Sequence, residues 1–338
     1  MCDYDTIENM VKNASIQTIL EIKPIQGADF IEVCRVLGWQ TVIKKDQYRI
    51  GDKIIFVPID TVLPLCEWSS FLQDKKDSSK PIIVKTCKMK NTISQGVIFP
   101  LNILPEASYE EGQDVSEILG IKHYESPLPQ NTEAIGKFPT VYLSITDEDN
   151  MKNSLDAYNE LKDCGFDIEV TLKIDGTSAS YITPVDDNTM VCSRRLSLKD
   201  NDNVYWKIGR RYKLIDTFKG LAISGEIYGD GIQKNKLKIT GNDLAVFNVK
   251  NLIENRIYNP QELTDFCVRE NLKKVPTLKV FKSGELPDID ALQEYVNDLK
   301  YPNGTPAEGA VFRPRETLYS NSLQKELSLK LINQNYKD

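Results

Sequence analysis

Short β-prone runs separated by turn signals dominate the first third of the chain. Turns are indicated at Gly27-Ala28-Asp29 and at Gly51-Asp52, each between two such runs. Because strands of this length at this spacing are typical of all-β domains, the pattern predicts a sandwich or a small barrel. The predicted strands are Ile16–Ile22, Ile31–Val36, Gln40–Ile43, Lys53–Val57, Pro81–Thr86 and Gln95–Phe99.

The rest of the chain mixes helical and strand patterns. Helical periodicity predicts helices at Asp149–Leu161, Gln261–Asn271 and Asp288–Leu299. A strand is predicted at Glu169–Ile174, and the order of elements favours an α+β fold over a regular βαβ alternation. A proline-rich stretch at Glu125–Pro139 marks a boundary between domains. We therefore expect an OB-type β-barrel over residues 1–125, a linker over 126–137 and a second domain over 138–338.

Length and composition describe an ordinary globular protein. The chain has 338 residues, which suggests about two domains, and is 41% hydrophobic and 27% charged. No apolar run approaches the roughly 18 residues that span a bilayer, and the N-terminus lacks the pattern of a signal peptide. The sequence predicts a cytosolic or nuclear protein without a membrane partner.

The cysteines and the histidine limit the chemistry. Seven cysteines are scattered without a C-x-x-C pair, which argues against a zinc site or a disulfide framework. A Ser-His-Asp or Cys-His mechanism would have to use His123, the only histidine, which has no companion motif. An enzyme of this composition is therefore expected to use lysine, carboxylates and a metal ion.

Basic residues gather at two places although the net charge is -7. Charge runs are usually solvated faces, but rings between cations favour nucleic acid because bases stack on them. The second group is interleaved with Tyr205, Trp206 and Tyr212. The candidate nucleic-acid contacts are Lys85, Lys88 and Lys90 in the first group, and Arg210 and Arg211 in the second.

The motif Lys173-Ile174-Asp175-Gly176 carries the candidate chemistry. On a strand, Lys173 and Asp175 project from one face, which pairs an attacking amine with a carboxylate that suits Mg²⁺. Gly176 removes a side chain where a phosphate would come close. Because a lysine with a pKa near 10.4 is protonated at neutral pH, the site is expected to lower this pKa.

Four further segments follow in order: Cys192-Ser193-Arg194-Arg195, Ser224 to Gly229, Glu308 to Arg313 and Ser328 to Ile332. With the lysine motif they resemble the collinear motifs of the covalent nucleotidyltransferases, the superfamily of polynucleotide ligases and capping guanylyltransferases. The N-terminal OB-like domain, with Gly51 to Pro58 and Ser94-Gln95-Gly96, resembles the ATP-dependent RNA ligases of the Deinococcus and Naegleria type. DNA ligases and capping guanylyltransferases usually place their OB domain last.

The resemblance implies an ATP-grasp-like nucleotidyltransferase domain of antiparallel sheets and helices. It implies that Lys173 carries AMP from ATP, and that a monomer joins RNA 3′-hydroxyl and 5′-phosphate ends in RNA repair. The other roles implied are Asp175, Glu226 and Glu308 around Mg²⁺ or Mn²⁺, Arg194 at the ribose or phosphates, Phe247 on adenine against Val311, and Lys330 at the α-phosphate.

Two positions depart from the pattern of these relatives. Asn150 stands where arginine is common, and Ser328 stands where many relatives have the first lysine of a lysine-x-lysine pair. Alternatives within the same chemistry are a DNA ligase or an mRNA capping guanylyltransferase. A non-enzyme alternative is an RNA-binding module on a decayed ligase fold.

Overall fold

The computed structural model describes residues 12–74, 77–124, 129–145 and 147–336. The chain forms two compact units. The first comprises Met1–Ser126 and Lys152–Leu155, and the second comprises Pro127–Met151 and Asp156–Asp338. No helix in these described ranges is long and apolar enough to cross a membrane.

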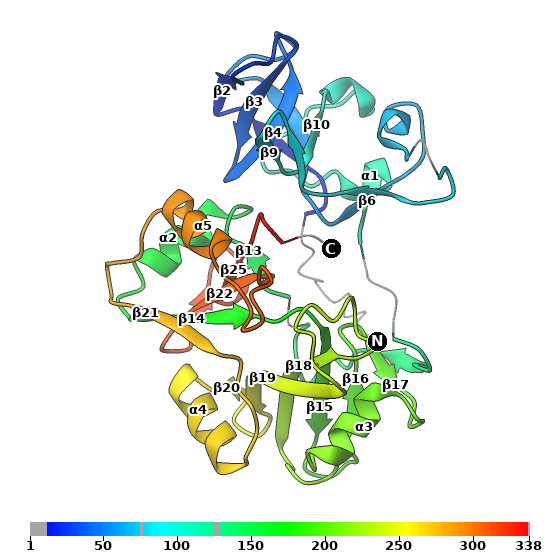
Figure 1. Ribbon diagram of the computed structural model, residues 1–338, viewed down its shortest axis with the longest axis vertical. Helices are drawn as coiled ribbons and strands as arrows, with labels where there is room; N and C mark the ends of the chain where they lie inside the picture. The colour runs from blue at the N-terminus through cyan, green and yellow to red at the C-terminus, as the bar shows by residue number, and fades with distance from the viewer. Residues whose placement is uncertain (1–11, 75–76, 125–128, 146, 337–338) are drawn as a thin grey trace. The chain divides into compact units, whose positions relative to one another are not determined.

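The first unit consists of small antiparallel sheets, drawn from blue to cyan in Figure 1. Their orders are β1-β5-β10, β2-β3-β4 and β11-β6-β7, with a separate β8-β9 hairpin. The strands are β1 (Ser15–Thr18), β2 (Glu21–Pro24), β3 (Ile31–Val36), β4 (Trp39–Lys44), β5 (Lys53–Val57), β6 (Thr61–Leu63), β7 (Ile82–Val84), β8 (Cys87–Met89), β9 (Thr92–Ser94), β10 (Val97–Phe99) and β11 (Lys122–His123). Short helical turns lie at η1 (Ser70–Leu72), η2 (Leu101–Ile103) and α1 (Ser116–Leu119).

Strand β5 is buried on both faces. Its consecutive apolar residues alternate, so that Ile54 and Phe56 pack in one hydrophobic cluster with Trp39. Ile55 and Val57 pack in a second cluster on the opposite face. A run of apolar residues without polar alternation is what a strand with two buried faces requires.

The second unit contains a seven-stranded and a five-stranded sheet (Figure 1). The seven-stranded order is β12-β17-β16-β15-β18-β19-β20, and the five-stranded order is β13-β25-β22-β14-β21. The strands are β12 (Ala134–Lys137), β13 (Asp149–Asn150), β14 (Ile168–Lys173), β15 (Thr177–Thr183), β16 (Met190–Cys192), β17 (Leu196–Leu198), β18 (Leu221–Gly229), β19 (Asn242–Asn251), β20 (Arg256–Ile257), β21 (Thr277–Phe281), β22 (Gly309–Pro314), β23 (Tyr319–Ser320), β24 (Lys325–Glu326) and β25 (Leu329–Ile332).

Four helices, α2 (Leu155–Lys162), α3 (Val204–Arg211), α4 (Pro260–Arg269) and α5 (Ile289–Asn297), complete the described part of this unit. Polar caps fix where three of them begin, because a side-chain oxygen accepts from the first free N–H groups. Asn203 caps α3, Asp288 caps α5, and Asn259 with Glu262 forms a capping box on α4. Helices α3 and α4 cover the seven-stranded sheet, whose core contains Tyr181 and Phe266.

Two predicted ranges differ from the observed elements. The helix expected at Asp149–Leu161 starts only at Leu155, because Asp149–Asn150 forms β13, which pairs in parallel with β25. A partner strand about 180 residues away thus outweighs the local helical pattern. The expected linker, residues 126–137, contains β12, which pairs with β17 at the edge of the seven-stranded sheet.

Candidate active site

The lysine motif lies where the chain passes from one sheet to the other. Strand β14 ends at Lys173 in the five-stranded sheet, and β15 begins at Thr177 in the seven-stranded sheet. The crossover is only Ile174-Asp175-Gly176. The motif therefore receives groups from both sheets.

Neighbouring strands bring Glu308 and Lys330 to Lys173. Lys173 is opposite Gly309 of β22, and Lys330 of β25 is opposite Val311 of β22. The Lys173 Nζ atom donates to Glu308 Oε1 at 2.5 Å. Because residues paired across strands project on the same side, Lys173, Val311 and Lys330 share one face of this sheet.

Glu226 reaches the same place from the seven-stranded sheet. It lies opposite Ser178, two residues beyond Gly176. A Cβ on Gly176 would lie 2.3 Å from the Ile227 carbonyl oxygen and 2.8 Å from Glu226 Cγ. Glycine is thus required here because β18 comes too close for a side chain. The sequence interpretation had given a different reason, the approach of a phosphate.

Burial and the nearby charge of Glu308 disfavour ionisation of two carboxylates of the site, Glu226 and Asp175. Burial, opposed by Lys173 and reinforced by Glu308, raises the pKa of Glu226 to about 8. Burial and then Glu308 also raise the pKa of Asp175, whose Oδ2 atom is buried without a hydrogen-bond partner. An unsatisfied carboxylate oxygen beside two further acids fits a divalent cation.

The same carboxylates are not arranged as a tight ligand set. Among the described residues, no three acidic, histidine or cysteine side chains lie close enough to hold one ion directly. Oxygen ligands at a longer range suit Mg²⁺, which keeps several of its waters. The site therefore fits a cation held in part through water.

The protonation of Lys173 differs from the sequence expectation. Burial opposes its charge, but the carboxylates of Glu308 and Glu226 outweigh burial and raise the pKa of Lys173. Burial and the nearby charge of Lys173 lower the pKa of Lys330. Lys173 is thus a charged partner of Glu308 in this structure.

Arg194 contacts Asp147, two residues before β13. Its Nε atom donates to Asp147 Oδ1 at 2.5 Å, and Arg195 lies 3.8 Å from the other oxygen of that carboxylate. Although burial opposes it, Arg194 lowers the pKa of Asp147. With about a third of its side chain exposed, Arg194 stands at the rim of the site.

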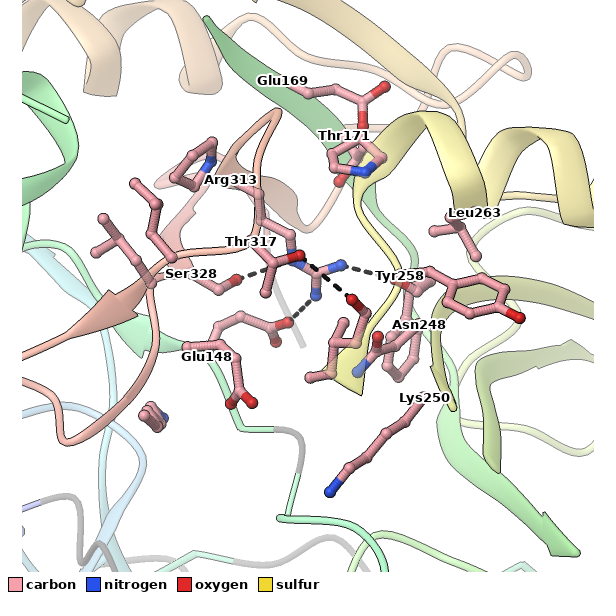
Figure 2. Close-up of a pocket in the computed structure, with 18 of the residues that line it drawn as sticks. Glu148, Glu169, Thr171, Asn248, Lys250, Tyr258, Leu263, Arg313, Thr317 and Ser328 are labelled. Atoms are coloured by element: carbon pink, nitrogen blue, oxygen red, sulfur yellow. Dashed lines mark hydrogen bonds and ion pairs between the residues drawn. The ribbon is translucent and has the colours of Figure 1, made fainter. Parts of the chain in front are cut away.

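A pocket of the second unit lies between β14 and β19, and of the predicted site residues only Phe247 lines it. It is lined by Thr171 and Glu169, which alternate with Lys173 toward the same face, and by the half-buried Phe247. Figure 2 shows Arg313 extending between Glu148 and Ser328 in this pocket. Residues of both sheets thus line this pocket.

Arg313 organises this pocket, and the sequence analysis assigned it no role. Its guanidinium donates to Ser328 Oγ at 2.9 Å, to the Phe247 carbonyl at 2.7 Å and to the Glu148 carboxylate. Although burial opposes the charge of Glu148, Arg313 lowers its pKa. The only sequence signal was the place of Arg313 on the face of β22 that also carries Val311.

The structure shows what surrounds Asn150 and Ser328, the two positions that depart from the pattern of relatives. Asn150 is buried in β13 opposite Lys330, and the Met151 N–H donates to the Lys330 carbonyl at 2.9 Å. Ser328 accepts from Arg313 rather than presenting a cation to the site. Lys325, three residues before Ser328, pairs with Asp149 at 2.6 Å.

The candidate nucleic-acid contacts fall into two different settings. Lys85, Lys88 and Lys90 are exposed along the β8-β9 hairpin and the residues that lead into it. Arg210 pairs with Asp200, whereas Arg211 donates to the Asn242 carbonyl at 2.7 Å. The hairpin thus presents its cations more openly than α3 does. Lys75 and Lys76, from the first basic run, lie outside the described residues, as does Thr146.

Comparison with known proteins identifies the group to which this site belongs. A model of an OB-fold domain matches residues 13–101, and a model of RNA ligases matches residues 166–332. A structure of a Naegleria gruberi RNA ligase mutant without ligand is 31% identical, with a TM-score of 0.82, and the match covers 96% of this chain and 97% of that chain. This chain belongs to the RNA ligase family.

Further structures of the Naegleria ligase agree. The form with pyrophosphate is 32% identical over 96% of this chain and 97% of that chain, with a TM-score of 0.82. A lysine-to-alanine mutant with ATP and Mn is 32% identical over 95% and 97%, with a TM-score of 0.81. A comparison with curated proteins found no match. The predicted OB-fold domain followed by an α+β ligase domain is confirmed, and so is the predicted class of RNA ligase.

Proposed function

We propose that this RNA ligase joins 3′-hydroxyl and 5′-phosphate RNA ends in RNA repair, through AMP carried on Lys173. ATP is the co-substrate and Mg²⁺ or Mn²⁺ the metal, as supported by the related ligase structures with ATP and Mn. The observation that carries the proposal is the Lys173 amine, 2.5 Å from Glu308 and within the electrostatic reach of Glu226. This amine faces the candidate cation site.

Asp175, Glu226 and Glu308 would hold the divalent cation. The cation supplies positive charge that offsets these carboxylates and the charge that develops on the α-phosphate. Neutralising Glu308 and Glu226 would offset the two charges that contribute most to raising the Lys173 pKa. Lys330, whose own charge disfavours a second ammonium nearby, lowers it further. The unpaired Asp175 Oδ2 atom supports this assignment.

The reaction then proceeds by three phosphoryl transfers. The neutral Lys173 amine attacks the α-phosphorus of ATP, a P–N bond forms, and the bond to pyrophosphate breaks. The RNA 5′-phosphate oxygen next takes the AMP and frees Lys173. Finally, the RNA 3′-hydroxyl attacks the activated 5′-phosphate and AMP leaves. Arg194 and Lys330 offset phosphate charge during these transfers.

The pocket lined by Phe247 suits the nucleoside. Phe247 stacks on adenine, with Val311 on the facing strand, and the bonds from Arg313 to the Phe247 carbonyl and to Glu148 fix this wall. Aromatic stacking gives affinity without demanding an exact hydrogen-bond pattern. Discrimination between adenine and guanine therefore depends on the polar groups that line the pocket.

We propose that the exposed lysines Lys85, Lys88 and Lys90 at the β8-β9 hairpin make the first contacts with RNA. Arg210 and Arg211 are assigned a secondary contact, because both already have protein partners. We further propose that the enzyme acts as a monomer in the cytosol or nucleus.

Sealing of nicked duplexes tests the proposed function. A labelled 5′-phosphate at a nick is expected to become resistant to phosphatase when the 3′-hydroxyl strand is RNA and when ATP and Mg²⁺ are present. Equal sealing of an all-DNA nick would indicate a DNA ligase. RNA binding without sealing or lysine labelling would indicate a decayed ligase that serves as a binding module.

A further inference from the structure

Tyr301 is a buried aromatic residue behind the catalytic motif. It follows α5 and lies in the turn before β22, where the backbones of Lys300 and Pro306 pair. Only 2% of Tyr301 is exposed, and its ring packs in a cluster with Leu172 and Ala307. The side chain therefore approaches β14 from beneath the face that carries Lys173.

The Tyr301 hydroxyl joins three residues of the proposed site. It accepts from the Asp175 N–H at 2.9 Å and from the Glu308 N–H at 3.2 Å. It donates to the Lys173 carbonyl at 3.1 Å. One oxygen atom thus ties together the backbones of the candidate nucleophile and of two candidate metal-shell carboxylates.

These three bonds use the full capacity of the group. A phenol hydroxyl has one proton to donate and two lone pairs to accept with. Burial, followed by the charge of Glu308, raises the pKa of Tyr301, so the donor proton is retained. The hydroxyl has no capacity left for nucleotide, metal or RNA, which separates its role from that of a catalytic residue.

The connection matters because the joined residues belong to different segments. Lys173 ends β14 and Asp175 lies within the crossover between the sheets, whereas Glu308 is more than 130 residues further along the chain. Strand pairing fixes Gly309 opposite Lys173, but Asp175 lies outside both strands. Within the described residues, the Tyr301 hydroxyl links the Asp175 backbone to Glu308, the residue before β22.

We propose that Tyr301 is a positioning residue for lysine adenylylation, which sets the spacing between the Lys173 amine and the carboxylates of Asp175 and Glu308. This inference rests on the proposed function, in which those groups bring Lys173 and a cation to the α-phosphate of ATP. An error of about 1 Å in such an arrangement can slow a reaction by about a hundredfold.

Tyr301→Phe tests the role, because it keeps the ring in its cluster and removes only the hydroxyl. Tyr181→Phe is a matched control: Tyr181 is equally buried, and its hydroxyl donates to the Tyr205 carbonyl at 2.8 Å, with no contact to Lys173, Asp175 or Glu308. Single-turnover formation of lysyl-AMP, measured over a range of ATP concentrations, separates the rate of reaction from the affinity for ATP.

The expected result is a rate at saturating ATP that falls by about ten- to a hundredfold in Tyr301→Phe. The ATP concentration for half-maximal rate should stay within about threefold of wild type, since the pocket that binds the nucleoside is untouched. Tyr181→Phe should retain the wild-type rate while losing some thermal stability, because it too loses a buried hydrogen bond. Sealing of a pre-adenylylated nick, which needs no attack by Lys173, should decline less than adenylylation.

Three results would overturn the inference. A rate in Tyr301→Phe within twofold of wild type would show that the hydroxyl positions nothing. Equal rate losses in both variants, or equal losses of adenylylation and of pre-adenylylated sealing, would assign Tyr301 to general stability. Absence of lysyl-AMP in the wild-type protein would instead refute the proposed function and this inference together.

Discussion

Replacing Gly176 with alanine places one methyl group against the strand that carries Glu226. The added Cβ would lie 2.3 Å from the Ile227 carbonyl oxygen and 2.8 Å from Glu226 Cγ. The optimum separation of non-bonded heavy atoms is about 3.5 Å, so the crossover and β18 must move apart by about 1 Å. The carbonyl belongs to the backbone, and a rotamer change of Glu226 cannot relieve this contact.

The displacement should affect catalysis more than stability. Overpacking of this kind costs about 1–3 kcal/mol. For a unit of this size, each kcal/mol lowers the melting temperature by about 2–4 °C. The same shift separates Glu226 from Lys173 and Asp175, and a misplacement of about 1 Å can slow the reaction by about a hundredfold. We therefore expect a folded protein with strongly impaired adenylylation.

Single-turnover lysyl-AMP formation and thermal unfolding measure the two effects. Gly136→Ala is the control, because Gly136 lies on β12 of the same sheet and an added Cβ there meets nothing within 4 Å. The control should adenylylate like wild type. A Gly176→Ala protein with a wild-type rate and melting temperature would refute the steric reasoning.

Three further predictions concern charge. The pKa of Glu226 is raised from 4.5 to about 8, so the native state binds one more proton than the unfolded state between these pH values. The stability of the protein in metal-free buffer should therefore fall as the pH rises through this window. Melting curves measured across this pH range should show the fall in wild type but not in Glu226→Gln. Arg313→Lys should raise the ATP concentration for half-maximal adenylylation about tenfold with a smaller change in maximal rate, because a lysine ammonium lacks the planar guanidinium whose Nε and two Nη atoms reach Ser328, Phe247 and Glu148. An unchanged ATP dependence would exclude a role of Arg313 in binding ATP. Joint replacement of Lys85, Lys88 and Lys90 by alanine should weaken RNA binding and flatten its salt dependence, with lysyl-AMP formation unchanged; an unaltered salt slope in filter binding would place the RNA elsewhere.

Residues in local motifs were accessible from the sequence. Lys173, Asp175, Glu226 and Glu308 stand in short phrases whose residue types carry the chemistry and whose order is preserved along the chain. The barrel strands were also predictable, because alternation and turn residues act within a few positions. β5 is an example, since its unbroken apolar run matches a strand buried on both faces.

Contacts between distant segments were not accessible. Tyr301 and Arg313 look like ordinary residues of a turn and a strand, and their roles come from bonds to groups between 7 and 165 positions away. The state of Lys173 was likewise hidden, because its pKa depends on how close Glu308 and Glu226 lie. Long-range pairing with Lys330 also decided that Asp149–Asn150 is a strand.

The central claim, that Lys173 carries AMP, is tested most directly by locating the label after incubation with α-labelled ATP and Mg²⁺. We predict an acid-labile label on the peptide that contains Lys173, which transfers to nicked RNA and is absent in Lys173→Ala. Labelling that persists in Lys173→Ala, or that arises from GTP in place of ATP, would contradict this account.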